Sequence, residues 1–121
     1  MKYLFLFAIS FSAIAETYLI EGNLVSFENK DGLLLKGCQK KCEALKTINA
    51  HRTIEMREVT KNLKFVGAPG SDVCHETYQA KSLLGRDSKT KDQKAFCLFP
   101  DLSMVEINSL TDYLIKNKII R

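Results

Sequence analysis

Four cysteines are the residues of this chain best suited to chemistry. Cys38 and Cys42 lie close together, whereas Cys74 and Cys97 are far apart in the sequence. An even cysteine count in a small exported protein predicts two disulfides. A bond between Cys74 and Cys97 would close a loop of about 23 residues, worth roughly 3 kcal/mol, and would leave Cys38 to pair with Cys42. The two crossed pairings stay open from the sequence.

The close pair Cys38 and Cys42 could also be half of a metal site or a redox pair. Structural zinc takes four ligands, usually from two close pairs. Redox pairs usually have a Cys-x-x-Cys spacing within a βαβ unit, which this segment lacks. The sequence therefore predicts neither a metal ion nor a cofactor, because the remaining possible ligands are scattered, at Cys74, Cys97, His51 and His75.

Nucleophilic or acid–base catalysis has few candidate groups. His75 follows Cys74, but adjacent residues of a helix do not face each other. Glu76, Asp101 and Glu106 could supply paired carboxylates for glycoside hydrolysis. A helix start and a turn already explain the first two. We therefore expect no catalytic residues. A small hydrolase is less favoured than a binding domain or a membrane-active protein.

The first 15 residues have the composition of a signal peptide. Lys2 precedes the apolar run 3–11, and Ala13-Ile14-Ala15 fits a small-x-small cleavage site. The run is shorter than the roughly 20 residues of a membrane-spanning helix, and no later segment has a long apolar run. We expect residues 16–121 to form a single domain of a bacterial protein, exported to the periplasm or the extracellular space.

The net charge of +4 is spread along the chain. Nucleic-acid-binding domains usually cluster their basic residues, so we expect no nucleic-acid partner. We also expect a monomer with no transmembrane segment after removal of the signal peptide.

Strand and helix patterns predict a small α+β domain. We expect strands at 17–27 (bent at Gly22), 33–35, 95–99 and 104–107, with a hairpin turn at Asn29–Gly32. Helices are expected at 38–50, at 73–84 and from Ser109 onward. Residues 53–59 and 63–66 fit a second hairpin or a helical continuation. The expected fold is an antiparallel sheet of hairpins with two or three packed helices, stabilised by disulfides.

The helix expected at 73–84 has signals at both ends. Asp72 would cap its start and Gly85 would follow its end. The helix expected at 38–50 would place Cys38, Cys42, Leu45 and Asn49 on one face.

A family resemblance lies within residues 72–107. The segment Cys97-Leu98-Phe99-Pro100-Asp101-Leu102-Ser103 is similar to the Cys-x-Phe-x-Asp-Gly-Ser pattern of a family of small secreted bacterial domains of unknown function, often labelled hemolysins. Leu102 replaces the usual glycine, and the family's later cysteines are missing. The resemblance implies a secreted domain with no assigned reaction, and membrane activity only through the label.

The leading hypothesis is a non-catalytic binding domain for a protein or envelope component, with inhibition as one form of binding. Arg86, Lys89 and Lys91 lie in a charged loop at 86–94, and Asp101 lies in the turn at Pro100. Binding residues concentrate on exposed loops. We expect a Cys74–Cys97 bond to hold these two loops side by side. The runner-up is a membrane-active, hemolysin-like protein.

Overall fold

Six strands form a closed antiparallel barrel in the order β1-β2-β3-β6-β5-β4. The computed structural model describes residues 16–39, 41–56 and 68–121, so the expected signal peptide at 1–15 lies outside the described residues. The strands are β1 Glu16–Ile20, β2 Asn23–Lys30, β3 Leu33–Lys36, β4 Lys81–Asp87, β5 Gln93–Leu98 and β6 Met104–Glu106. The antiparallel α+β fold is confirmed. Closure into a barrel was not expected.

The barrel consists of two three-stranded meanders, β1–β2–β3 and β4–β5–β6. They join at two seams, where β1 pairs with β4 and β3 pairs with β6. The turns Glu21-Gly22 and Asp31-Gly32 have positive φ at both residues, as two-residue type I′ hairpins require. The sequence predicted the second turn, but the bend expected at Gly22 within one strand is a full hairpin turn.

Side chains fill the interior of the barrel. The rings of Tyr18, Phe27 and Phe96 contact one another, with centroids 5.0 to 5.3 Å apart. Ile20, Leu34 and Met104 belong to the same buried cluster. Inward and outward residues alternate along each strand of a barrel. The barrel interior is therefore a packed core and leaves the outer surface to carry function.

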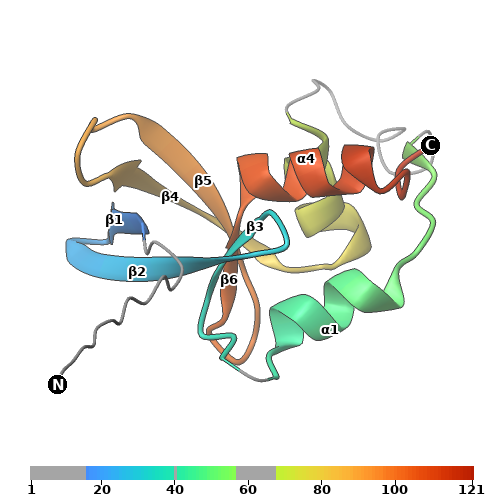
Figure 1. Ribbon diagram of the computed structural model, residues 1–121, viewed down its shortest axis with the longest axis horizontal. Coiled ribbons are helices and arrows are strands. Elements are labelled where there is room, and N and C mark those ends of the chain that lie inside the picture. Colours follow the sequence, from blue (N-terminus) through green and yellow to red (C-terminus); the bar gives the residue numbers. More distant parts are fainter. Residues whose placement is uncertain (1–15, 40, 57–67) are drawn as a thin grey trace, which may run out of the picture.

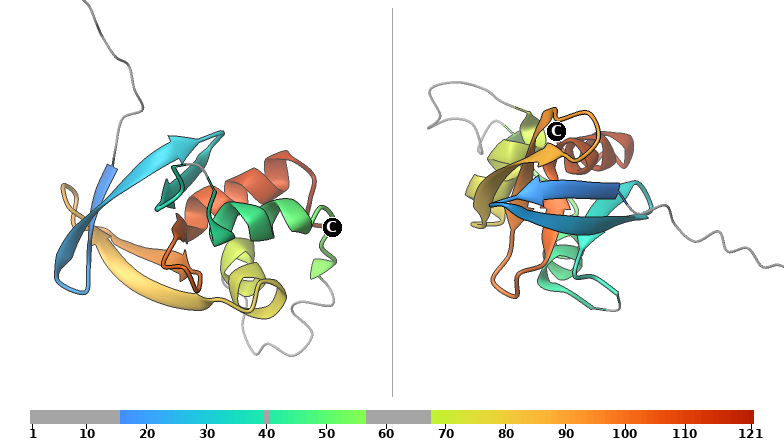
Figure 2. Two further views of the ribbon diagram at one scale, coloured as in Figure 1. Left: turned by 90° about the horizontal axis from the view of Figure 1, so that it is seen from below. Right: turned by 90° about the vertical axis from the view of Figure 1, so that its left-hand side faces the viewer.

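Helices lie at one end of the molecule, with most of the barrel at the other (Figures 1 and 2). Those that lie wholly within the described residues are α1 Glu43–Ala50, the short α3 Pro69–Asp72, its π-helical continuation η1 Val73–Thr77, and α4 Ile107–Lys116. A second apolar cluster joins these helices to outward-facing strand residues. Its members include Leu35, Cys97 and Val105 from the strands and Ile48, Leu110 and Leu114 from the helices.

The structure contains two disulfides, Cys38–Cys42 and Cys74–Cys97. This is the first of the pairings considered from the sequence, and both crossed pairings are excluded. Cys74 and Cys97 are 0% exposed. Their bond fixes η1 onto β5, across a sequence separation of 23 residues.

The helix expected at 73–84 is wrong in its second half. The helical residues end at Thr77, Gln79 has a positive φ of 54°, and β4 begins at Lys81. The apolar residues of this segment have helical spacing, but pairing of β4 with both β5 and β1 overrides that local preference. The Asp72 side chain makes no cap hydrogen bond to η1.

Gly85 serves a different purpose from the one expected. It lies inside β4, where an added Cβ would come within 2.7 Å of the Leu19 carbonyl oxygen and 3.0 Å of the Phe96 ring. Glycine at this position therefore allows β1 to approach β4 closely at their seam.

The other two expected helices begin at different residues. Cys42 has an extended backbone, so α1 starts at Glu43 and not at Cys38. The buried residues of α1 are Ala44 and Ile48, whereas Asn49, which was expected on the apolar face, is exposed. The last helix, α4, starts at Ile107, two residues before Ser109.

The second hairpin expected near residues 53–66 lies largely outside the described residues. Within them, Ile54 forms an isolated parallel bridge with Ile120. The Ile54 N–H donates to the Ile119 carbonyl at 2.8 Å, and the Arg121 N–H donates to the Ile54 carbonyl at 2.9 Å. These bonds attach the chain after α1 to the C-terminal residues.

Candidate functional site

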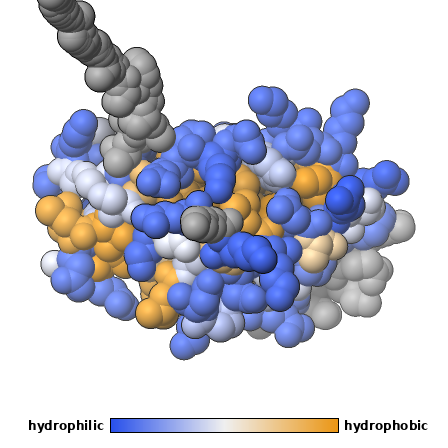
Figure 3. Space-filling view, turned by 60° about the horizontal axis from the view of Figure 1, so that its bottom comes forward, coloured by the Kyte–Doolittle hydropathy of each residue, from blue (hydrophilic) through white to orange (hydrophobic). Residues whose placement is uncertain are grey.

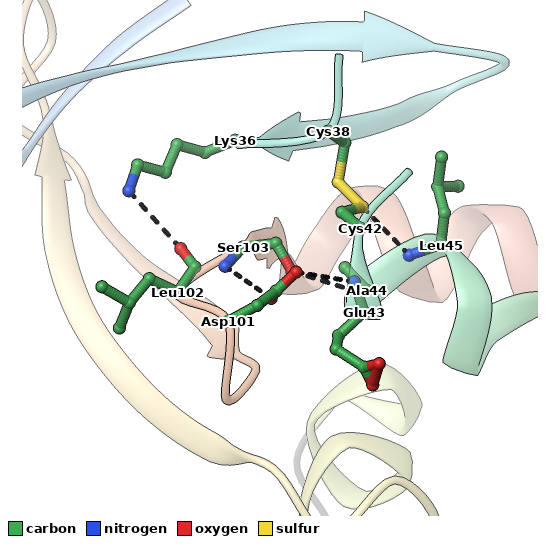
Figure 4. Close-up of a disulfide and its surroundings, with 9 residues drawn as sticks. All are labelled: Lys36, Cys38, Cys42, Glu43, Ala44, Leu45, Asp101, Leu102 and Ser103. Atoms are coloured by element: carbon green, nitrogen blue, oxygen red, sulfur yellow. Dashed lines mark hydrogen bonds between the residues drawn. A yellow bond between two sulfur atoms is a disulfide. The ribbon is translucent and has the colours of Figure 1, made fainter. Parts of the chain in front are cut away.

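The turn between β5 and β6 docks onto the start of α1 (Figure 4). Asp101 Oδ2 accepts a hydrogen bond from the Glu43 N–H at 2.9 Å, and Ser103 Oγ accepts one from the Ala44 N–H at 3.1 Å. The Ser103 hydroxyl also donates to Asp101 Oδ1 at 2.6 Å. The first N–H groups of a helix have no partner within the helix. This Asp-x-Ser turn supplies two of the partners from elsewhere in the fold.

These contacts lower the pKa of Asp101. The main cause is the hydrogen bond from the Ser103 hydroxyl; the Glu43 and Ser103 N–H groups add to it, and partial burial opposes it. The side chain therefore remains a carboxylate at neutral and mildly acidic pH. Asp101, expected to bind a partner, also holds α1 in place.

Leu102, between Asp101 and Ser103, has a left-handed backbone with φ of 70° and is 61% exposed. Glycine adopts this conformation readily, whereas other residues pay roughly 1–2 kcal/mol. A glycine at position 102 would therefore adopt this turn with less strain than leucine.

An open groove of about 660 Å³ lies beside this junction. Its walls come from α1 and the residue before its cap, together with Asp101 from the turn. The lining includes Lys41, Cys42, Leu45 and Lys46. Asp101 therefore does border a groove, although not the surface expected from the sequence.

Arg86, Lys89 and Lys91 gather on the hairpin between β4 and β5. The expected loop at 86–94 is shorter in the structure, because the strands extend to Asp87 and from Gln93. The Arg86 guanidinium donates to the Lys91 carbonyl at 3.0 Å. Asp87 Oδ1 accepts from the N–H groups of Thr90 and Lys89, which lower the pKa of its carboxyl.

The structure does not bring Asp101 to this basic hairpin. The hairpin lies at the start of β5 and the Pro100–Asp101 turn lies beyond its end, as Figure 1 shows. The expected side-by-side arrangement is wrong, because β5 runs the length of the barrel between them. The four predicted binding residues belong to two separate surfaces.

The sequence reasoning missed an exposed apolar face of the barrel. Leu24 is 67% exposed and Leu84 is 62% exposed. Leu19 lies directly opposite both Leu24 and Arg86, and opposite residues of antiparallel strands share a face. Leu84 is two residues from Arg86 and lies on that face as well. We refer to Leu19, Leu24 and Leu84 as the leucine face.

Figure 3 shows hydrophobic side chains at the surface of the strand end of the molecule, on the left of that view. The sequence held a signal for such a surface. In the runs 18–20, 24–25 and 83–84 consecutive residues are apolar, so both sides of the strand carry apolar side chains.

The groups considered for catalysis have separate partners. Cys74 is bonded to Cys97. Glu76 Oε2 lies 3.0 Å from His75 Nδ1 at the surface. Glu106 is 4% exposed and caps α4, where its carboxylate accepts from two backbone N–H groups. The carboxylates of Glu76, Asp101 and Glu106 thus bind different groups in different places.

A second cavity, of about 370 Å³, lies between the C-terminal ends of α1 and α4, where His51, Tyr113 and Asn117 line it. The Tyr78 ring packs 5.4 Å from the His51 ring, and burial raises the pKa of Tyr78. Among the described residues, no cluster of three or more His, Cys, Asp or Glu side chains could hold a metal ion. The described helices are also too short or too polar to cross a membrane.

No protein-family model, no curated protein and no solved structure matches this chain.

Proposed function

We propose that this protein is an exported, non-catalytic domain that binds a partner protein through its leucine face. The observation that carries the proposal is the exposure of Leu24 and Leu84, at 67% and 62%, on one outer face of the barrel. Single exposed apolar residues are common on protein surfaces, but a gathered patch marks an interaction site.

Charges of both signs surround the leucine face. Arg86 is exposed beside it and Lys89 on the adjoining hairpin, while Glu21 in the β1–β2 turn and Asp92 are exposed as well. An anionic lipid surface attracts a basic cluster, whereas protein interfaces have a polar rim with complementary charges. The mixed rim favours a protein of the cell envelope over a lipid surface, and binding over lysis of membranes.

Export is supported by the sequence of residues 1–15 and by the two disulfides. Disulfides form and persist in oxidising compartments such as the periplasm. β1 begins at Glu16, so cleavage after Ala15 would leave all six strands complete. N-terminal sequencing of the protein from expressing cells should begin at or near Glu16. An intact Met1 on soluble cytosolic protein would contradict export.

The binding proposal is tested with two variants that differ in the surface they change. Leu24→Glu/Leu84→Glu places two charges on the leucine face. Ile115→Glu is the matched control, because Ile115 is also a large apolar residue, 56% exposed, but lies on α4. Each oxidised protein is immobilised and exposed to envelope extract. A captured protein is then identified by mass spectrometry, and its affinity is measured with purified components.

We expect the parent and Ile115→Glu to bind the same protein with similar affinity, and the leucine-face variant to lose binding while circular dichroism shows an intact fold. Equal binding by all three proteins would contradict the proposal. Lysis of liposomes that the leucine-face variant alone fails to cause would instead support the membrane-active function.

A further inference from the structure

The disulfide Cys38–Cys42 lies where the chemistry of a thiol is altered. Cys42 is the N-cap residue of α1, and its Sγ accepts a hydrogen bond from the Leu45 N–H at 3.3 Å (Figure 4). If the disulfide is reduced, the same N–H and the positive end of the helix face a Cys42 thiolate. Both stabilise the thiolate and lower the pKa of the thiol.

Cys42 is also within reach of an attacking thiol. It lines the open groove of about 660 Å³ beside α1, which Cys38 does not. Cys38 and Cys42 are each 6% exposed, whereas Cys74 in η1 and Cys97 in β5 are 0% exposed. Thiol–disulfide exchange depends on access to the sulfur that is attacked. The groove gives Cys42 the access that the buried pair lacks.

Charged groups around the groove act in opposite directions. Lys41 and Lys46 favour a thiolate at Cys42, while the carboxylates of Glu43 and Asp101 disfavour it. Two charges of each sign therefore line the groove, and Lys46 is paired with Glu43 at 3.9 Å. The Leu45 N–H contacts the Cys42 sulfur directly.

We propose that Cys38–Cys42 is an exchange-active disulfide that accepts electrons from a dithiol, while Cys74–Cys97 stays oxidised. A thiolate of the dithiol attacks Sγ of Cys42, the Cys38–Cys42 bond breaks, and Cys38 leaves as a thiolate that takes a proton from water. The second thiolate of the dithiol then attacks its own partner sulfur, and Cys42 leaves as a thiolate. Two electrons pass to the protein, and the dithiol becomes a disulfide.

The fold can survive this reduction. Asp101 and Ser103 still accept hydrogen bonds from the start of α1. Ala44 and Ile48, which are 0% and 1% exposed, keep the helix in the core. Stabilisation of the reduced form makes a disulfide a stronger oxidant. The site can therefore cycle between both states in a folded protein, independently of any partner on the leucine face.

The first test compares the two disulfides in one molecule. The folded, oxidised protein is treated with dithiothreitol under native conditions, quenched with acid at set times and alkylated, and its peptides are mapped by mass spectrometry. We expect Cys38 and Cys42 to be reduced at least about tenfold faster than Cys74 and Cys97. Equal rates, or faster reduction of the buried pair, would overturn the proposal.

The second test compares the two thiols. Cys38→Ser leaves Cys42 free, and Cys42→Ser leaves Cys38 free. The pH dependence of alkylation by iodoacetamide gives each thiol pKa. We expect Cys42 to titrate below the ordinary value of about 8.5 and below Cys38. The reverse order would refute the assigned roles. If a variant does not fold, the selectively reduced parent protein is titrated by the same peptide mapping.

Discussion

Each of the two disulfides attaches a helical segment to the barrel, but the two bonds differ in loop length and in exposure. Cys74–Cys97 joins residues 23 apart, and Cys38–Cys42 joins residues four apart. Both disulfides belong to the apolar cluster that contains Val105. Cys74 and Cys97 are 0% exposed, whereas Cys38 and Cys42 are 6% exposed and Cys42 borders an open groove. In the chain-entropy model the loops contribute about 3 and about 2 kcal/mol. The long, fully buried link therefore favours stability, whereas the short link beside the groove fits the exchange proposed for it.

The largest effect is expected from removing the buried disulfide. Cys74→Ala/Cys97→Ala should lower the free energy of unfolding by about 2–5 kcal/mol, because it frees a long loop and empties space in the core. Cys38→Ala/Cys42→Ala should cost about 2 kcal/mol or less. Urea denaturation of both double variants measures the difference. Equal losses in the free energy of unfolding would contradict the different roles assigned to the two disulfides.

Ser103 tests how far the attachment of α1 depends on its disulfide, because Ser103 holds the start of α1 by hydrogen bonds and not by a covalent bond. Ser103 is 1% exposed, and Ser103→Ala leaves the Ala44 N–H without its acceptor and removes a donor to Asp101. We expect a loss of about 1–3 kcal/mol in the free energy of unfolding. Ser26→Ala, at an exposed position of β2, is the control and should change stability little. A Ser103 variant as stable as the control would show that α1 does not depend on the turn.

Leu102 tests the same turn in the opposite direction. Its φ of 70° favours glycine, so Leu102→Gly should raise the free energy of unfolding by up to about 1 kcal/mol, after the added freedom of the unfolded chain is allowed for. Leu102→Ala, which loses the side chain but keeps the strained backbone, should bring no such gain. Thermal unfolding distinguishes the two. A lower melting temperature for the glycine variant would contradict this account of the turn.

Asp101 should give the smallest effect, visible in the dependence of stability on pH. Its folded-state pKa is lowered, so its contribution is complete above the unfolded-state value of about 3.9 and is lost as the pH falls through the folded-state value. Asp101→Asn should be less stable than the parent at pH 7, and the gap should narrow below about pH 4. Urea titrations at several pH values measure the gap. A constant gap would exclude this role for the carboxylate.

Local signals predicted the elements whose contacts are local. The turn at Asn29–Gly32 and the turn at Pro100–Asp101 follow from residue types that suit positive φ or side-chain bonding to the backbone. The last helix was expected from Ser109 onward, and its residues Leu110 and Leu114, four positions apart on one helix face, are 0% exposed. Their positions depend on helical spacing within a few residues, which the sequence displays.

The errors occurred where distant residues decide the structure. Leu84 continues the helical spacing of Val73 and Ala80, but pairing with two partner strands makes residues from Lys81 onward β4. The start of α1 is set by Asp101 and Ser103, which lie 58 and 59 residues from their partners in the chain. Such contacts leave little trace in the local sequence.

The candidate surfaces likewise divide into features set by the local sequence and features set by distant contacts. Arg86, Lys89 and Lys91 were expected together and lie on one hairpin, because neighbours in a short loop cannot separate. Their expected proximity to Asp101 depended on the direction of β5 and failed. The leucine face depends on the seam between β1 and β4, which a single sequence does not reveal.

The two seams of the barrel also constrain how the chain assembles. During synthesis the meander β1–β2–β3 emerges first, with β1 and β3 as unpaired edges. Tyr18 pairs with Asp87 and Leu35 pairs with Val105, so both pairings form only after the later residues have been synthesised. Pairings between distant segments slow folding, and open edges invite pairing with other chains. β4 covers the edge of β1 and β6 covers the edge of β3, so a chain interrupted before β4 would keep both edges open to pairing with other chains.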